Sequence, residues 1–202
     1  MAECAVCGSK LGLFSSRQKL ASAGVMCCPG CVDQWYLDQK ERALAEMSRG
    51  GGIKELFRIV GATLTDPDDP SHRSTLYGHL IFTDKGVLFA ACEKVTTPQM
   101  NFMIHGGLLG ILIWELQYGK KNRQAQADAR MTTSAMAGDL TQVMARCRRV
   151  IAIPKASITE ITYSWFRGLR IKGFTGKESK SFALPNKRQT YEEFRSHLDG
   201  YR

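Results

Sequence analysis

Residues 4–31 read CAVCGSKLGLFSSRQKLASAGVMCCPGC, and this stretch decides how the N-terminal part of the chain folds. It contains two Cys-x-x-Cys pairs, Cys4 with Cys7 and Cys28 with Cys31, separated by 20 residues. Two such pairs at this spacing are typical of a site in which four thiolates bind one zinc ion. We therefore predict one structural Zn2+ held by these four cysteines.

The other three cysteines have different predicted roles. Cys27 adjoins Cys28 in a predicted strand, so its side chain should point away from the metal, but the sequence leaves open whether Cys27 can replace Cys28 as a ligand. Cys92 and Cys147 are expected to be small core residues. The N-terminus MAECAVCGSK has no apolar signal core, so we expect a reducing, cytoplasmic compartment, in which disulfides are a poorer alternative to zinc. A redox role like that of thioredoxin is a further alternative.

The residues around the cysteines predict a small zinc module with a treble-clef-like arrangement. A turn at Gly24 indicates a hairpin over residues 19–27. A helix over residues 32–48 would carry the second cysteine pair at its N-terminus, where the helix dipole stabilises thiolates. Three glycines at 50–52 end this helix and mark a flexible joint, so the module is expected to span residues 1–49.

Residues 50–74 are predicted to form a linker with one short helix. Four apolar residues between Ile53 and Val60 recur at helical spacing. The TDPDDP sequence at 65–70 cannot continue a helix, and it lacks the spacing of an EF-hand. We therefore predict a solvated turn there.

The Cys-x-x-Cys-Gly-x-x-Leu-Gly-Leu opening, followed by a later Cys-x-x-Cys, resembles a small bacterial four-cysteine domain of unknown function. The resemblance covers about residues 1–33. It implies a structural zinc ion with Cys4, Cys7, Cys28 and Cys31 as ligands, and it implies no known catalysis.

The C-terminal part alternates strand signals with turn signals. A turn at residues 84–86 predicts a hairpin between strands at 78–83 and 87–91. Further strands are predicted at 150–153, 157–165, 169–174 and 179–184. A capping box that starts at Thr190 predicts a C-terminal amphipathic helix. The pattern predicts an α+β fold in which an antiparallel curled sheet or small barrel is plugged by this helix.

Two segments, LYGHLIFTDKGVLFA and VIAIPKASITEI with the strands that follow it, resemble bacterial pleckstrin-homology-like and GRAM-like domains. The resemblance covers about residues 75–92 and 149–199. It implies a domain over residues 75–202 with a helical insertion at about 93–149. It also implies binding to lipid headgroups or protein segments, on a fold with no inherent catalysis.

The predicted insertion contains an apolar segment, FMIHGGLLGILIW, from Phe102 to Trp114. As a helix it would reach about 20 Å, which is too short for the roughly 30 Å of a bilayer core. The sequence leaves three alternatives open. The segment could be buried in the protein, could lie in a membrane interface, or could form a homo-oligomer contact through Gly106 and Gly110.

The chain of 202 residues has a formal net charge of +9, and residues 119–202 carry 17 basic against 7 acidic side chains. A surface of this kind favours an anionic partner. The candidate contacts are Lys120, Lys121, Arg123, Arg167, Arg170 and Lys172. Because the last three alternate with aromatic side chains, a nucleic-acid interface stays open as an alternative.

The sequence contains no nucleotide-binding, zinc-protease or serine-hydrolase motif, and its four histidines are scattered. We therefore expect a non-enzymatic adaptor in the cytoplasm, with peripheral membrane association left open. Its structural zinc would support a pleckstrin-homology-like domain that recognises a protein partner or an anionic membrane surface. The alternative is a zinc-containing nucleic-acid-binding protein.

Overall fold

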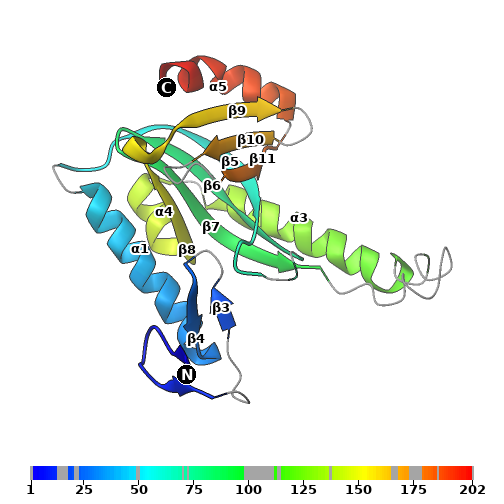
Figure 1. The fold of residues 1–202 in the computed structure, drawn as a ribbon. Coiled ribbons are helices and arrows are strands. Elements are labelled where there is room, and N and C mark those ends of the chain that lie inside the picture. Colours follow the sequence, from blue (N-terminus) through cyan, green and yellow to red (C-terminus); the bar gives the residue numbers. More distant parts are fainter. Residues whose placement is uncertain are drawn as a thin grey trace.

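The computed structural model describes residues 2–12, 18–20, 23–48, 51–69, 71, 73–97, 112, 115–136, 138–164, 168–172, 179–185 and 187–201. Its fold is α+β, as predicted, with antiparallel sheets and the helices α1, α3, α4 and α5 (Figure 1).

The N-terminal region consists of two short antiparallel hairpins and a helix. The elements are β1 (Ala2–Glu3), β2 (Lys10–Leu11), β3 (Gln18–Leu20), β4 (Val25–Cys27), a 3-10 turn η1 (Pro29–Cys31) and α1 (Val32–Ser48). β1 pairs with β2, and β3 pairs with β4. The predicted hairpin before Cys28 and the predicted helix after Cys31 are both confirmed.

The rest of the chain is built on one seven-stranded antiparallel sheet with the order β8-β7-β6-β5-β11-β10-β9. The strands are β5 (Glu55–Thr65), β6 (Ser74–Thr83), β7 (Gly86–Thr96), β8 (Arg149–Pro154), β9 (Glu160–Ser164), β10 (Gly168–Lys172) and β11 (Ser179–Ala183). A 3-10 turn, η3 (Lys155–Ser157), leads from β8 towards β9. Within the described residues β8 and β9 are not paired with each other, so the sheet curls without closing into a barrel.

The predicted short helix between Ile53 and Val60 is wrong, because residues 55–60 form the first part of β5 and Ile53 precedes it outside any helix. The strand has two register shifts against β6, one between Glu55 and Phe57 and one between Val60 and Ala62. Each shift moves the apolar side chains out of strict alternation. The resulting spacing imitates that of a helix, and β5 instead lies in the middle of the sheet.

Two glycines allow neighbouring backbones to approach closely in this sheet. A Cβ at Gly78 would lie 2.1 Å from the carbonyl oxygen of Ala90, and one at Gly86 would lie 2.3 Å from that of Ile153. Gly86 follows the predicted turn at Asp84 and begins β7. The predicted hairpin is therefore confirmed, and its glycine is required by the packing of β8.

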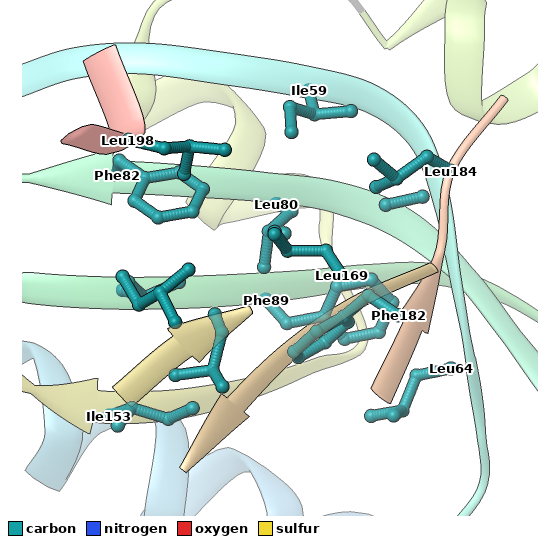
Figure 2. Close-up of a cluster of buried hydrophobic side chains, with 14 of the residues drawn as sticks. Ile59, Leu64, Leu80, Phe82, Phe89, Ile153, Leu169, Phe182, Leu184 and Leu198 are labelled. Atoms are coloured by element: carbon teal, nitrogen blue, oxygen red, sulfur yellow. The ribbon is translucent and has the colours of Figure 1, made fainter. Parts of the chain in front are cut away.

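One face of the sheet carries the main hydrophobic core, which Figure 2 shows. Phe82, Phe89 and Phe182 are fully buried there, from strands in both halves of the sheet. Helix α5 (Lys187–Tyr201) covers this face with Leu198 and Tyr201, and the Tyr201 hydroxyl donates to the Thr83 carbonyl oxygen at 2.9 Å. The predicted C-terminal helix is confirmed, although it begins before its predicted cap.

The opposite face is covered by helices from the insertion and from the N-terminal region (Figure 1). The insertion contains a π-helical turn η2 (Glu115–Gly119), α3 (Lys120–Ala135) and α4 (Leu140–Arg146). Val143 and Met144 of α4 pack on Ile81 and Leu88 of the sheet. Of the apolar segment 102–114, only the exposed Leu112 lies within the described residues.

Helix α1 runs along β8, so the glycine joint does not separate the N-terminal module from the sheet. Leu44 packs on the cluster around Val143, and the Lys40 ammonium donates to the Cys147 carbonyl oxygen at 3.2 Å. No helix in the described part of the chain is both long and apolar enough to cross a membrane.

Candidate metal centre and the ion pairs beside it

Four cysteines from two distant segments meet at the N-terminal end of α1. The sulfur atoms of Cys4, Cys7, Cys28 and Cys31 all lie within 4.8 Å of one another. The Cys28 sulfur lies 3.7 Å from that of Cys4 and 3.9 Å from that of Cys7. This cluster could hold a metal ion.

The first Cys-x-x-Cys pair is shaped by backbone hydrogen bonds. The Gly8 amide donates to the Cys4 carbonyl oxygen and the Cys4 amide to that of Ser9, each at 2.9 Å. Gly8 has a φ of 70°, a left-handed conformation that favours glycine. The turn directs the sulfur atoms of Cys4 and Cys7 to the same side.

The second pair is carried by the turn before α1. Pro29 begins η1, and the Cys31 amide donates to the Cys28 carbonyl oxygen at 2.9 Å. The Cys28 amide lies 3.4 Å from the sulfur of Cys4 and donates to it. The two pairs are thus already joined by a backbone-to-sulfur hydrogen bond.

The surroundings favour ionisation of one thiol in particular. Amide groups of Cys7, Cys28 and Val6 donate to Cys4 and lower the pKa of its thiol to about 6. The pKa of Cys7 is also lowered, mainly by the Ser9 hydroxyl. The pKa of Cys31 is raised, mainly because its thiol hydrogen-bonds the Cys28 sulfur and this bond favours the protonated form.

The donor set fits zinc. A tetrahedral ion with Zn–S bonds of about 2.3 Å holds its ligands about 3.8 Å apart. The two short sulfur distances from Cys28 match this value. The four cysteines would fill all positions of a tetrahedral ion, so a bound Zn2+ would act as a structural crosslink between residues 4–7 and 28–31.

The other cysteines lie outside the cluster. Cys27 is fully buried against Leu20 and Val32, and burial raises the pKa of its thiol. Cys92 and Cys147 are buried in the sheet region. The buried positions of Cys92 and Cys147 agree with the prediction that they are core residues. The Cys27 thiol contacts the Cys4 side chain, so it lies beside the cluster without belonging to it.

A buried group of charged side chains joins α1 to the sheet directly beside the metal centre. Arg149 of β8 lies 2.9 Å from Asp66 and 2.7 Å from Asp68, and all three side chains are buried. The Tyr36 hydroxyl of α1 donates to Asp68 at 2.9 Å, and the Arg149 guanidinium lies 4.4 Å from the centre of the Tyr36 ring. Lys94 adds a contact of 2.7 Å to Asp66.

These ion pairs adjoin a cavity of about 310 Å3 between the module and the sheet. Pro29 and Tyr36 line it from the module, and Lys94 and Arg149 line it from the sheet. Burial raises the pKa of Tyr36 well above its usual value, so its hydroxyl keeps the proton that it donates. The buried charges thus hold the helix that follows the second cysteine pair against β8.

The prediction of a solvated turn at 65–70 is therefore wrong for Asp66 and Asp68. Asp69 also has a local role, because it accepts amide groups of Ser71 and Ser74 at 2.9 and 2.7 Å. The sequence shows three acidic residues here and a basic doublet before Val150, but nothing in it pairs the two segments. Only the fold brings them together.

Of the six basic residues predicted to contact an anionic surface, the five that the structure describes lie on two different elements, α3 and β10. Lys120 and Lys121 are exposed on α3, whereas Arg123 forms an ion pair with Glu115. Arg170 and Lys172 lie on β10, where Lys172 forms an ion pair with Glu160. Arg167 lies outside the described residues.

Comparison with known proteins does not assign the chain to a family. No protein-family model matches the chain, and neither a curated protein nor a solved structure is significantly similar to it. The resemblances to a four-cysteine domain and to pleckstrin-homology-like domains therefore stay predictions.

Proposed function

We propose that this protein is a non-enzymatic binding protein in which one structural zinc ion organises a treble-clef-like module on a pleckstrin-homology-like domain. The observation that carries the proposal is the four-cysteine cluster at the start of α1. Its sulfur spacing fits a closed tetrahedral site, which serves folding rather than chemistry at the metal.

The order of elements around the cluster supports the treble-clef-like assignment. A turn with Cys4 and Cys7 is followed by the β3–β4 hairpin, and then by a helix whose first residues follow Cys28 and Cys31. Zinc would link the turn to the helix. The buried ion pairs of Arg149 then link that helix to the sheet.

The sheet supports the pleckstrin-homology-like assignment at the level of architecture. It is antiparallel, curled and open between β8 and β9, and α5 packs on its main core. An antiparallel sheet with a C-terminal helix on its core agrees with the sequence resemblance, although the central strand β5 precedes residue 75, where the resemblance begins. The resemblance implies a binding role towards a protein or an anionic surface.

The nucleic-acid alternative has less support. Tyr163, one of the aromatic residues that could stack on bases, is stacked on Tyr191 of α5 with ring centres 4.0 Å apart and planes 9° apart. Lys172 is already in an ion pair with Glu160. Base stacking needs an available ring face, and one face of Tyr163 is occupied.

Metal analysis tests the zinc centre. Protein purified under reducing conditions should contain about one zinc per chain, and Cys4→Ser and Cys28→Ser should lose it. The matched control is Cys27→Ala, which removes the neighbouring thiol and should keep the metal. A metal-free, fully folded wild type, or zinc loss in Cys27→Ala equal to that in Cys28→Ser, would overturn the assignment.

Binding to labelled single-stranded DNA and RNA tests the partner class. We expect the wild type to show no nucleic-acid binding whose affinity falls steeply as the salt concentration rises. If such binding occurs, and Arg170→Gln with Lys172→Gln reduces its salt dependence, the nucleic-acid alternative replaces the proposal.

A further inference from the structure

Exposed apolar side chains lie just before the start of α3. Seven large apolar side chains of the described residues are markedly exposed, and three of them, Leu112, Leu116 and Tyr118, precede α3, whereas Met131 lies near the other end of that helix. Leu116 is 75% exposed and Met131 70%, the two highest values among them. Large apolar side chains that cluster in solvent mark a contact surface.

The position of α3 leaves this region accessible. Ala129 and Thr133 are buried against the sheet, one helical turn apart. Met131 lies on the opposite side of the helix, as does Lys120 by helical periodicity. Figure 1 shows that the start of α3 lies beyond the ends of the strands, far from α1.

The exposed apolar residues have basic neighbours. Lys120 and Lys121 follow η2 directly, and both are exposed. Neither takes part in an ion pair with any residue that the structure describes. The two lysines therefore add positive charge beside Leu116 that the described part of the protein does not neutralise.

From this juxtaposition we infer that the start of α3, with Leu116, Lys120 and Lys121 at its centre, binds the surface of an anionic lipid membrane. Leucine side chains enter the boundary between headgroups and acyl chains, while lysines contact anionic headgroups. The inference rests on the proposed binding function and names its partner and its site, which is separate from the metal centre.

A second copy of the chain is the less suitable occupant. A symmetric contact would bring the same surface of both copies together, so the lysines of one copy would approach the lysines of the other. An anionic surface complements these charges instead.

Vesicle binding tests the inference on the full-length, zinc-loaded protein. Wild type should sediment with vesicles of phosphatidylcholine mixed with phosphatidylserine, and not with phosphatidylcholine alone. Each lysine near the surface contributes about fivefold to binding, so Lys120→Glu with Lys121→Glu should lower it by at least about 25-fold. Leu116→Ser should lower it by about tenfold or more.

Two matched controls separate the site from general effects. Arg42→Glu with Arg146→Glu makes the same change in net charge at exposed positions of α1 and α4. Leu37→Ser removes an exposed leucine from α1. Both controls should bind as wild type does, and all variants should keep their melting temperature and zinc content.

Three results would overturn the inference. One is a folded, zinc-loaded wild type that ignores anionic vesicles. Another is an equal loss of binding in the arginine control and the lysine variant. The third is a change from oligomer to monomer in Leu116→Ser without lipid, which would assign the surface to a second copy. None of these results bears on the zinc assignment. That assignment would instead be wrong if purified wild type contained no metal.

Discussion

The N-terminal module and the seven-stranded sheet are stabilised by different means. The buried apolar set of the module has five described members, and two of them are Cys4 and Cys27. The main core of the sheet has eighteen, including Phe82, Phe89 and Phe182. A core as small as that of the module offsets little of the conformational entropy of its residues, so we expect a metal bound by the cysteine cluster to stabilise it further.

Helix α1 belongs to both regions. Its first residue, Val32, packs in the module, whereas Leu44 packs on the sheet. Tyr36 lies between them and contacts Asp68 and Arg149. We expect the module to depend on a bound metal and the sheet not to, and the ion pairs at α1 are where the two regions meet.

The largest expected effect comes from the core of the sheet. Phe82 is fully buried and stacked on Phe57 at 4.3 Å between ring centres. Phe82→Ala should lower the free energy of unfolding by about 4 kcal/mol, as measured by urea denaturation. Zinc should stay bound in native buffer, and Leu56→Ala, at an exposed position of β5, is the control. Zinc release from folded Phe82→Ala would contradict the view that the module and the sheet are stabilised by different means.

The next effect concerns the ion pairs at the junction. Arg149→Met should destabilise the protein by about 3 kcal/mol, because Asp66 and Asp68 would stay buried without their main partner. Arg148→Met removes an exposed arginine next to it and should change stability by less than about 0.5 kcal/mol. Equal effects of the two substitutions in urea denaturation would show that the pairs contribute nothing.

The dependence of stability on pH tests the sheet through one buried histidine. His79 is fully buried, and burial, together with the charge of Arg58, lowers its pKa. The opposite charge of Glu55 and a backbone contact at Thr133 oppose this shift. Below a pH of about 6.5 the unfolded chain binds a proton that the native state resists, so stability falls as pH falls, by at most about 1.4 kcal/mol per pH unit.

This fall ends once the pH passes below the lowered pKa of native His79. Urea denaturation across pH at saturating zinc should show a smaller slope for His79→Leu than for wild type. His197→Gln is the control at an exposed position of α5. An unchanged slope in His79→Leu would assign the acid sensitivity to other groups.

The smallest expected loss of stability comes from removing one hydroxyl group, that of Tyr36. Tyr36→Phe removes the hydrogen bond to Asp68 and keeps the ring under Arg149, so it should cost about 1 kcal/mol. Zinc transfer to a chromophoric chelator should become faster, since Tyr36 lies one turn beyond the second cysteine pair. If the transfer rate does not change, the metal centre is not coupled to the sheet through this residue.

Local patterns predicted the elements that depend on near neighbours. The spacing of Cys28 and Cys31 predicted the ligand cluster, and the turn at Asp84 predicted the β6–β7 hairpin. β5 was mispredicted because its register shift beside Gly61, at a φ of 76°, changes which side chains face the core. Alternation is the main sequence signal of a strand, and a bulge removes it.

The junction could not be predicted for a different reason. Asp66 and Arg149 are 83 residues apart, and Tyr36 lies on a third segment. Charges in separate segments have no preferred pairing until the strand order is known, so the acidic segment at 65–70 was predicted to be a solvated turn. The strand order places β8 next to β7. This arrangement brings Arg149 to Asp66 and lets α1 pack on the sheet.

Amide hydrogen exchange of the full chain, with and without a zinc chelator in reducing buffer, tests the central claim most directly. Removal of the metal should abolish protection in residues 2–31 and in the first turns of α1, and should leave β6 and β7 protected to nearly the same degree. Unchanged protection of residues 2–31 in metal-free protein, or equal loss of protection in β6 and β7, would contradict it.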